Sequence, residues 1–376
     1  MKILFTGGGT GGHFYPIIAI AEEVSDIVKE HKVANLELYY MSPMPYNAGI
    51  LFDHHISYKR NYAGKLRRYF SILNFLDLFK TFWGVIKSVW DVYLIYPDVV
   101  FGKGGYASFP ALFAARILRI PVVIHESDAV PGRTNLWAGK FAERIALSFS
   151  EAAQYFKVES KIAYTGQPIR KELSMPRSST GHAFLGLEAD LPVILVLGGS
   201  LGARKVNDVI LEALPLLVEK YQVIHQTGKD NFDEIRETAK VILEASPNRN
   251  RYRPYAYLDS LTLRAAAGVA SLVISRAGST LFEIALWGLP SIVVPISEAV
   301  SHDQVKNAFA YARSGAAVVV EETNLTGNIL AAEISRILGS PEIAGKMKAS
   351  AREFVRPDAA RKIAEELLKI ALSHEV

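Results

Sequence analysis

Short apolar runs alternate with longer amphipathic stretches along almost the whole chain. The strand-like runs span residues 2–6, 36–41, 98–101, 121–125, 144–147 and 161–164 in the first half, and residues 192–197, 222–226, 252–256, 272–275, 290–294 and 316–319 in the second. Runs that are apolar on both faces and separated by helices are typical of parallel sheets covered on both sides. The pattern therefore predicts an α/β protein with two doubly wound domains.

Turn residues place the boundary between these domains after the strand that ends near residue 164. The segment Gly166-Gln-Pro-Ile-Arg170 is a turn, and a stretch that contains Pro, Ser and Gly separates it from the next strand. We expect a first domain over residues 1–166 and a second over residues 167–356. The last segment is helical in two pieces that meet near Arg356, and the final helix, about 357–376, is expected to complete the first domain.

Composition narrows the classes of function. Half of the 376 residues are hydrophobic and 21% are charged, which is enough apolar material for large buried cores. The absence of cysteine excludes disulfides and thiolate metal sites, and a net charge of +4 is too small to indicate nucleic-acid binding. The first apolar run is short and ends in glycines, so we interpret it as a strand and not as a signal peptide. No 18-residue stretch is free of charge, so no transmembrane helix is expected.

The first strand is followed by a glycine-rich loop, Gly7-Gly-Gly-Thr-Gly-Gly12, that opens a helix. Glycines at this place let backbone N–H groups approach a phosphate, and the helix N-terminus adds partial positive charge. An NAD site would also need a carboxylate at the end of the second strand, and that strand ends in Met41-Ser42. Dinucleotide binding is therefore disfavoured, and a purely structural turn would not need so many glycines.

Three more loops of this kind follow predicted strands, at residues 102–105, 198–202 and 276–280. Ser200 can add a hydroxyl donor to a phosphate in the second of them. The carboxyl ends of strands are where open α/β sheets bind ligands. Two loops in each half therefore predict a diphosphate-bearing ligand, bound in a cleft between the domains.

Several polar residues lie beside these loops. His13, in the first turn of a helix, is either a candidate general base or a packing histidine. His125 and Glu126, at the end of a strand, could remove a proton or orient the substrate, or they could make structural hydrogen bonds. Glu283 could accept ribose hydroxyls or stabilise a helix dipole. The chain has no Asp-x-Asp motif and no histidines at ligand spacing, so neither a metal nor another cofactor is expected.

Taken in order, these motifs resemble one family. The motifs are Thr6-Gly-Gly-Gly-Thr-Gly-Gly-His-Phe-Tyr-Pro16, Gly102-Lys-Gly-Gly-Tyr-Ala-Ser108, His125-Glu-Ser-Asp-Ala-Val-Pro-Gly132, Leu197-Gly-Gly-Ser-Leu-Gly-Ala203 and Ser275-Arg-Ala-Gly-Ser-Thr-Leu-Phe-Glu283. They are similar to those of the MurG family, the N-acetylglucosaminyltransferases of peptidoglycan lipid II synthesis. The resemblance covers nearly the whole chain.

The resemblance implies a GT-B fold, in which two Rossmann-like domains enclose a cleft. It also implies an inverting, metal-independent transfer of GlcNAc from UDP-GlcNAc to the 4-hydroxyl of MurNAc-pentapeptide-diphosphoryl-undecaprenol. This lipid-linked acceptor is lipid I, and the product is lipid II. Proteins of cell-wall synthesis are the expected protein partners.

The resemblance also implies roles for individual residues. On the donor side, Ser200, Ser279 and Thr280 would contact the diphosphate. Leu258 would contact the uracil, Glu283 the ribose, and Gln304 the GlcNAc hydroxyls. Leu281, Phe282 and Arg170 would lie close to the nucleotide. In the first half, His13 is the candidate base, assisted by Glu126. The residues implied to approach the acceptor are Thr10, Gly11, Gly12, Gly104, Gly105, Tyr106 and Asp128.

The chain departs from the family's pattern after His125-Glu126. The family commonly has Gln-Asn there, and this chain has Ser127-Asp128. Asp128 keeps acceptor oxygens and lacks the amide donor. The loop from Gly278 to Glu283 is also one residue shorter than in some members.

A membrane-bound acceptor calls for a membrane-facing surface. Residues 69–88 predict a helix with a narrow polar stripe and a broad apolar, aromatic surface. The basic residues just upstream suit anionic lipid headgroups; they are Lys59, Arg60, Lys65, Arg67 and Arg68. We expect a peripheral protein at the cytoplasmic face of the cell membrane, and a core helix or a dimer contact is the alternative interpretation.

Other functions remain open at this point. A diacylglycerol glycosyltransferase or a UDP-GlcNAc 2-epimerase would keep the fold and the donor, although an epimerase has no use for the apolar helix. A non-catalytic nucleotide-sugar-binding protein would not require a histidine and a carboxylate beside the loops.

Overall fold

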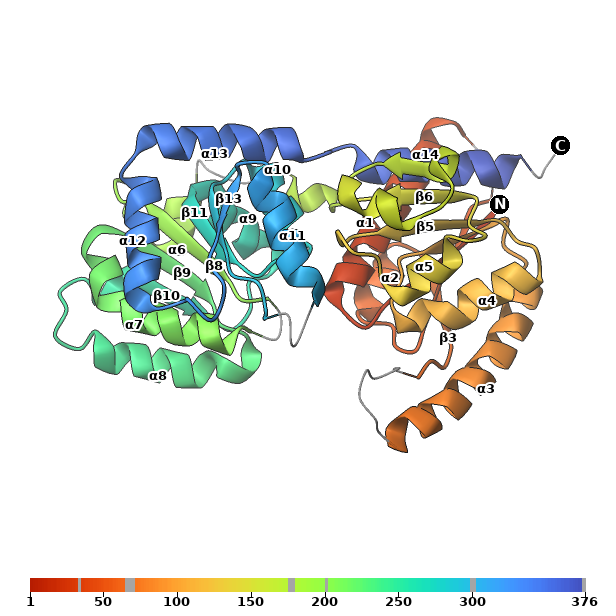
Figure 1. The fold of residues 1–376 in the computed structure, drawn as a ribbon, viewed down its shortest axis with the longest axis horizontal. Helices are drawn as coiled ribbons and strands as arrows, with labels where there is room; N and C mark the ends of the chain where they lie inside the picture. Colours follow the sequence, from red (N-terminus) through yellow and green to blue (C-terminus); the bar gives the residue numbers. More distant parts are fainter. Residues whose placement is uncertain (33–34, 65–71, 175–179, 200–201, 298–301, 374–376) are drawn as a thin grey trace. The chain divides into compact units, whose positions relative to one another are not determined.

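The computed structural model describes the chain except for residues 33–34, 65–71, 175–179, 200–201, 298–301 and 374–376. The chain divides into two compact units (Figure 1). The first unit consists of Met1–Arg170 together with Arg356–Val376, and the second consists of Lys171–Val355. The chain therefore leaves the first unit once and returns to it with its last helix.

The first unit contains a seven-stranded parallel sheet in the order β3-β2-β1-β4-β5-β6-β7. The strands are β1 (Lys2–Thr6), β2 (Glu37–Ser42), β3 (Ile56–Arg60), β4 (Val99–Gly102), β5 (Val122–Glu126), β6 (Arg144–Leu147) and β7 (Ile162–Tyr164). The strand order runs outward in both directions from the β1/β4 pair, which makes this pair the point where the order reverses.

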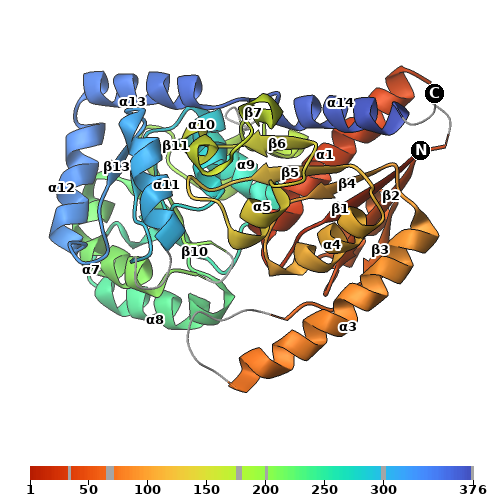
Figure 2. The ribbon, with the colours of Figure 1, turned by 45° about the vertical axis from the view of Figure 1, so that its right-hand side comes forward.

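Alternating side chains of this sheet enter two separate cores, because successive residues of a strand point to opposite faces. Ile3 and Phe5 pack with α1 (Gly11–Glu30) and α14 (Ala359–Leu372). Leu4 packs with helices of the other face, which are α3 (Ile72–Ile95), α4 (Phe109–Ile117) and α5 (Arg133–Ala138). The short α2 (Ala48–Asp53) lies against β3. In both views α3 runs beside α4, and its first turns extend beyond the sheet (Figures 1 and 2).

The last helix completes the core of the first unit. Ile363 and Leu367 of α14 are buried with the apolar face of α1. At the surface of this contact, Nη2 of Arg361 lies 2.9 Å from Oε2 of Glu30. An apolar stripe on a surface helix must be covered, and α14 covers the stripe that α1 and the sheet leave open.

The second unit repeats the plan with a six-stranded parallel sheet in the order β10-β9-β8-β11-β12-β13. Its strands are β8 (Val193–Leu197), β9 (Gln222–Gln226), β10 (Tyr252–Tyr255), β11 (Ala270–Ser275), β12 (Ser291–Val293) and β13 (Ala317–Val319). Here the order reverses at β8/β11.

Helices cover both faces of the second sheet as well. One core includes α7 (Arg204–Lys220), α8 (Phe232–Ile242), α12 (Gly327–Leu338) and α13 (Pro341–Phe354). The opposite core includes α6 (Gly181–Leu185), α9 (Ser260–Val269) and α10 (Thr280–Trp287). The remaining helix, α11 (His302–Arg313), lies against β13.

The prediction of two doubly wound α/β domains is confirmed, and each predicted strand is present with ends shifted by two residues or fewer. The sequence interpretation missed β3. This edge strand buries Ile56 and leaves the following four residues partly or fully exposed, so it lacks an apolar run. The helix predicted over residues 69–88 continues to Ile95, and residues 69–71 lie outside the described part of the chain.

We expect Leu367→Ala to lower the free energy of unfolding by about 2–5 kcal/mol, because it leaves a cavity between α14 and α1. Leu367 is fully buried. Urea unfolding followed by circular dichroism measures the change. Lys369→Ala, at an exposed position of the same helix, is the control and should change the free energy by less than about 0.5 kcal/mol. Equal unfolding midpoints for the two variants would mean that α14 contributes no packing energy.

Candidate functional site

The glycine-rich loops lie at the points where the strand order of each sheet reverses. In the first unit, residues 7–10 follow β1 and residues 103–105 follow β4, and these two strands are hydrogen-bonded neighbours. In the second unit, the loop that begins at Gly198 follows β8 and residues 276–279 follow β11, again neighbours. Both loops of a pair leave the same edge because the strands are parallel. Open α/β sheets bind ligands at this position.

Two of the helices that follow these loops begin without a side-chain cap. Among the described residues, neither the side chain of Thr10 before α1 nor that of Ser279 before α10 accepts a backbone N–H of the first helical turn. By contrast, α2, α9, α12 and α13 begin at side chains that accept from their first turns, namely Asn47, Asp259, Thr326 and Ser340. The N-termini of α1 and α10 therefore keep backbone donors and positive dipole charge for an anion.

His13 lies in the first turn of α1, close to the loop that follows β4. Its Nδ1 is 3.0 Å from Oγ1 of Thr10, and a Cβ added to Gly105 would lie 3.3 Å from its Nε2. Gly105 has a φ of 77°, which glycine adopts most readily. Burial, and secondarily the charge of Lys103, lower the pKa of His13 to about 4. The imidazole is therefore neutral at neutral pH, the form that can accept a proton.

Glu126 ends β5 and holds the loop that follows. Its Oε1 accepts the N–H of Asp128 at 3.0 Å. Its Oε2 accepts the N–H of Gly132 at 3.0 Å and Nδ2 of Asn135 at 2.9 Å. The side chain is buried. These three bonds turn the carboxylate toward its own loop, so that Glu126 fixes the position of Asp128.

Lys103, which the sequence interpretation did not select, lies in the loop after β4 and is buried. Its Nζ donates to Oγ of Ser127. Burial lowers the pKa of Lys103 to about 8, and the carboxylates of Glu126 and Asp128 oppose that shift. The signal in the sequence is a single charged residue inside a glycine-rich loop, Gly102-Lys-Gly-Gly105, where a turn would need none.

A buried hydrogen-bond network continues from Ser127 toward the end of the first unit. The hydroxyls of Ser127 and Ser148 both donate to Oε1 of Gln167, at 2.7 Å and 2.8 Å. Ser148 also lies 3.2 Å from Nε2 of His125, and that nitrogen is 3.0 Å from the carbonyl oxygen of Gly166. Burial and the charge of Lys103 hold the pKa of His125 well below its usual value. His125 is thus a neutral structural group within the sheet.

Arg170 is the last residue of the first unit before the chain enters the second. Its guanidinium carbon lies 4.0 Å from the centre of the Tyr15 ring, a cation–π contact. Tyr15 belongs to α1, two residues after His13. The structure therefore places Arg170 near the loop after β1.

In the second unit, Gln226 connects two segments that the sequence interpretation had treated separately. Its Nε2 donates to the carbonyl oxygen of Gly199 at 3.1 Å, and its Oε1 accepts the N–H of Leu258 at 3.0 Å. Gln226 is a polar residue at the carboxyl end of β9, where open sheets bind ligands, and this was the signal that could have identified it. Ser200, predicted to meet a diphosphate, lies outside the described residues.

The hydrogen bond from the N–H of Leu258 to Gln226 affects the predicted role of Leu258. Its side chain is buried and its N–H donates to Gln226, so a ligand would meet its carbonyl oxygen or share the N–H. Among the described residues, a Cβ added to Gly199 would have no heavy atom within 4 Å, so the backbone there is open.

The loop after β11 leads into α10. Ser279 and Thr280 are partly exposed, and Glu283 lies in the first turn of the helix. Leu281 and Phe282 are buried, and the ring of Phe282 stacks on Phe354 at 5.6 Å between centroids. The last two side chains therefore belong to the core, and their contribution to a site is the backbone of the turn.

Gln304 lies in the first turn of α11 and supports the loop after β12. Its Oε1 accepts the N–H of Ile296 at 3.2 Å. In the same loop, the N–H of Ser297 lies 3.3 Å from Oε2 of Glu322, and Glu322 also pairs with Arg276 at 2.5 Å. Arg276 belongs to the loop after β11, so this pair ties the loops after β11 and β12 together.

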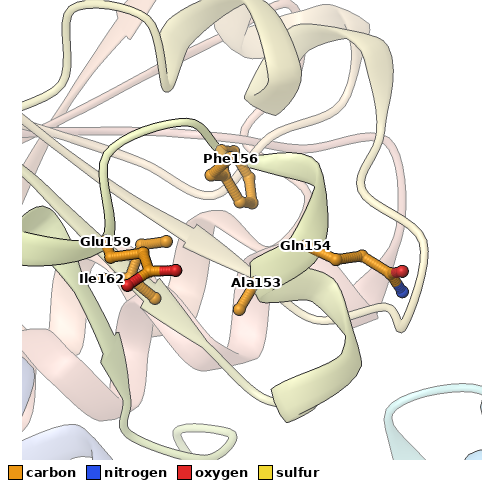
Figure 3. A pocket seen from close by; sticks show the side chains of 5 residues that line it. All are labelled: Ala153, Gln154, Phe156, Glu159 and Ile162. Atoms are coloured by element: carbon orange, nitrogen blue, oxygen red, sulfur yellow. The ribbon is translucent and has the colours of Figure 1, made fainter.

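One described pocket lies away from all of these loops. It holds about 320 Å³ at the edge of the first sheet, where the side chains shown in Figure 3 line it: Ala153, Gln154, Phe156, Glu159 and Ile162. None of the predicted site residues is among them. Within the described residues, no three His, Asp or Glu side chains are grouped to hold a metal ion, and no helix is long and apolar enough to cross a membrane.

Comparison with known proteins gives two family matches and many close relatives. The N-terminal domain of glycosyltransferase family 28 matches residues 3–147, and the C-terminal domain matches residues 193–365. The UDP-N-acetylglucosamine–N-acetylmuramyl-(pentapeptide) pyrophosphoryl-undecaprenol N-acetylglucosamine transferase of Treponema denticola is 38% identical over 85% of this chain and 83% of its own. The enzyme of the same name from Legionella pneumophila (strain Paris) is 38% identical over 93% of this chain and 92% of its own.

Solved structures give the fold. MurG of Acinetobacter baumannii superposes with a TM-score of 0.73 at 24% identity, covering 98% of this chain and 99% of its own. The UDP-GlcNAc 2-epimerase of Neisseria meningitidis, bound to UDP-GlcNAc, has a TM-score of 0.69 at 15% identity, covering 98% and 100%. These likenesses confirm the expected GT-B fold class.

We expect the imidazole rings of His13, His125 and His225, a fully buried residue of β9, to stay unprotonated from pH 8 down to about pH 5.5. Burial lowers the pKa of His13 to about 4 and that of His225 to about 3. Two-dimensional NMR of the histidine rings measures this, with His13→Asn used for assignment. In concentrated urea every histidine should titrate with a pKa of about 6.5, the value of an unfolded chain. Titration of His13 near that value in the folded protein would contradict the neutral imidazole.

Proposed function

The chain belongs to the MurG family of N-acetylglucosaminyltransferases, and from this membership we propose that it transfers GlcNAc from UDP-GlcNAc to the 4-hydroxyl of lipid I and so makes lipid II. The observation that carries the proposal is the identity of 38% over 85–93% of the chain. The glycine-rich loops at both points of strand-order reversal support it, because a nucleotide-diphosphate donor and a lipid-diphosphate acceptor each require an anion site.

The second unit binds the donor. The open N-terminus of α10, with the hydroxyls of Ser279 and Thr280, stabilises the charge that develops on departing UDP. Ser200 acts in the same way from the loop after β8. Glu283 accepts the ribose hydroxyls. The remaining donor contacts of this unit are the backbone of Leu258 with uracil, the turn of Leu281 and Phe282, and Gln304 with the sugar. Arg170, at the end of the first unit, contacts the nucleotide as well.

The first unit binds the acceptor. Neutral His13 takes the proton of the 4-hydroxyl while the acceptor oxygen forms its bond to the anomeric carbon and the bond from that carbon to UDP breaks. A single displacement of this kind inverts the configuration. Glu126 contributes by fixing Asp128, which meets the acceptor sugar. The acceptor also contacts the loop residues Thr10, Gly11, Gly12, Gly104, Gly105 and Tyr106.

The reaction runs without a metal in this proposal. The charge on the leaving diphosphate is met by helix N-termini and hydroxyl donors, the kind of preorganised dipoles that stabilise developing anions. The acceptor's lipid tail requires that the enzyme work at a membrane surface.

The exposed face of α3 is proposed to lie on that membrane, at its cytoplasmic side. Five large apolar side chains between residues 78 and 86 are 46–63% exposed: Leu78, Phe79, Phe82, Trp83 and Ile86. An exposed cluster of this kind marks an interaction surface. Lys59 and Arg60, at the end of β3, supply positive charge for anionic headgroups. Proteins of cell-wall synthesis are the expected partners at the membrane.

Wild-type protein should move labelled GlcNAc from UDP-GlcNAc to a short-chain lipid I analogue, in buffer with EDTA. His13→Ala should lower kcat by about 10²–10⁴-fold, the usual contribution of a general base. His31→Ala, at the opposite end of α1, is the control and should keep wild-type kcat. Product formation is measured by chromatography of the labelled lipid.

Three results would contradict parts of this proposal. Transfer to diacylglycerol without transfer to lipid I would assign a different acceptor. Conversion of UDP-GlcNAc to its C2 epimer would assign an epimerase. Loss of activity in EDTA would remove the metal-free mechanism.

Phe79→Ser combined with Trp83→Ser should reduce flotation of the protein with anionic liposomes, because it removes apolar area from the exposed face of α3. Phe184→Ser combined with Leu216→Ser is the matched control, since these side chains are 54% and 56% exposed on the second unit. The fraction of protein that floats is measured for each variant. Equal flotation of the α3 variant and the wild type would remove membrane contact by this face.

A further inference from the structure

Lys103 has a position that its structural role alone does not explain. The side chain is 2% exposed, and among the described residues its Nζ has one hydrogen-bond acceptor, Oγ of Ser127. An ammonium group has three N–H donors. Burying a charge costs free energy unless partners compensate for it, and a methionine of similar length would fill the space without this cost.

The neighbouring carboxylates are held by other groups. Glu126 accepts three N–H bonds from its own loop and from Asn135, so its orientation does not depend on Lys103. Asp128 and Glu126 act on Lys103 through their charge and favour its protonated form. The cluster therefore keeps a positive charge at one fixed point, and the loop around Glu126 would remain ordered without it.

The loop that carries Lys103 packs tightly against the loop that leads to His13, and the charge of Lys103 acts on the imidazole. A Cβ on Gly7 would lie 2.9 Å from Cβ of Lys103, and a Cβ on Gly105 would lie 3.3 Å from Nε2 of His13. Glycine at both places lets the two loops approach each other this closely. The N–H of Lys103 also donates to the carbonyl oxygen of Thr6, at 2.8 Å.

The groups around this pair come from three segments. Thr10 precedes α1 and contacts Nδ1 of His13, and Tyr106 of η1 (Tyr106–Ser108) lies against Gly9. Glu126, Asp128 and His125 lie at the end of β5 and on the loop after it. Of the charged groups, Lys103 is the one whose charge acts on His13.

We propose that Lys103 is a positioning residue for the transfer reaction, which keeps a fixed positive charge acting on His13 and donates a hydrogen bond to Ser127. The inference rests on the proposed role of His13 as the base. The charge keeps the imidazole unprotonated before the acceptor arrives. After His13 has taken the hydroxyl proton, the same charge destabilises the imidazolium, so that the proton passes to water and the base is restored. An anionic acceptor diphosphate offsets the charge during the transfer itself.

Electrostatics determines the direction in which loss of the Lys103 charge shifts the pKa of His13. A positive charge disfavours protonation of a nearby imidazole, so Lys103→Met should raise the pKa of His13. Lys103→Arg keeps the charge and should leave the His13 pKa low. Ser127→Ala removes the hydrogen bond and keeps the charge, so it should also leave that pKa low. Lys140→Met, an exposed lysine of the same unit, is the control.

Two measurements test the proposal. NMR titration of the His13 ring gives its pKa without requiring activity, and the pH dependence of kcat/KM gives the pKa that the reaction uses. We expect both to shift upward in Lys103→Met, so that the acidic limb of kcat/KM moves to higher pH, and neither to shift in Lys103→Arg. Lys103→Gln, which keeps a donor for Ser127, carries the same test if the methionine variant does not fold.

Failure of this proposal and failure of the proposed function would give different results. An unchanged His13 pKa in Lys103→Met and Lys103→Gln would overturn the proposal, and so would a raised pKa that leaves the kcat/KM profile in place. Absence of lipid I transfer by the wild type would instead overturn the proposed function. The NMR shift would still be observed in that case.

Discussion

The candidate site depends on one constraint: every strand of both sheets is parallel, so each sheet has a single edge at which all carboxyl ends emerge. The glycine-rich loops occupy that edge at β1/β4 and at β8/β11, where successive crossovers diverge to opposite sides. The divergence leaves space between helices that would otherwise close over the strand ends. Glycine is suited to these loops because a backbone with positive φ, as at Gly105 and Gly199, brings polar groups together without side chains.

The two units use this edge differently. In the first, buried polar side chains gather behind the loops and connect Lys103 through Ser127 and Gln167 to the end of β6. In the second, Gln226 alone joins the loop after β8 to the segment at Leu258. A network of neutral and charged groups can tune the ionisation of a base. In the second unit a single amide is sufficient to join the two segments.

The sequence predicted the fold class, the strands and the glycine-rich loops, because these depend on local apolar patterns and on residues with special backbone freedom. It missed β3, whose edge position needs only Ile56 to be buried. Lys103 and Gln226 each left a local signal in the sequence, but their hydrogen-bond partners could not be predicted, because these contacts join segments that are distant in sequence. The buried side chains of Leu281 and Phe282 show the converse: a motif predicted the right turn, although two of its side chains pack inward.

The return of the chain to the first unit through α14 has a consequence for synthesis. On a ribosome, residues 171–355 emerge as one continuous segment and can form their sheet and both cores at once. The first unit begins earlier and still lacks α14 until the last residues are made. The apolar stripe of α1 therefore stays uncovered during most of translation, and the half of the molecule that emerges first is the half that finishes folding last.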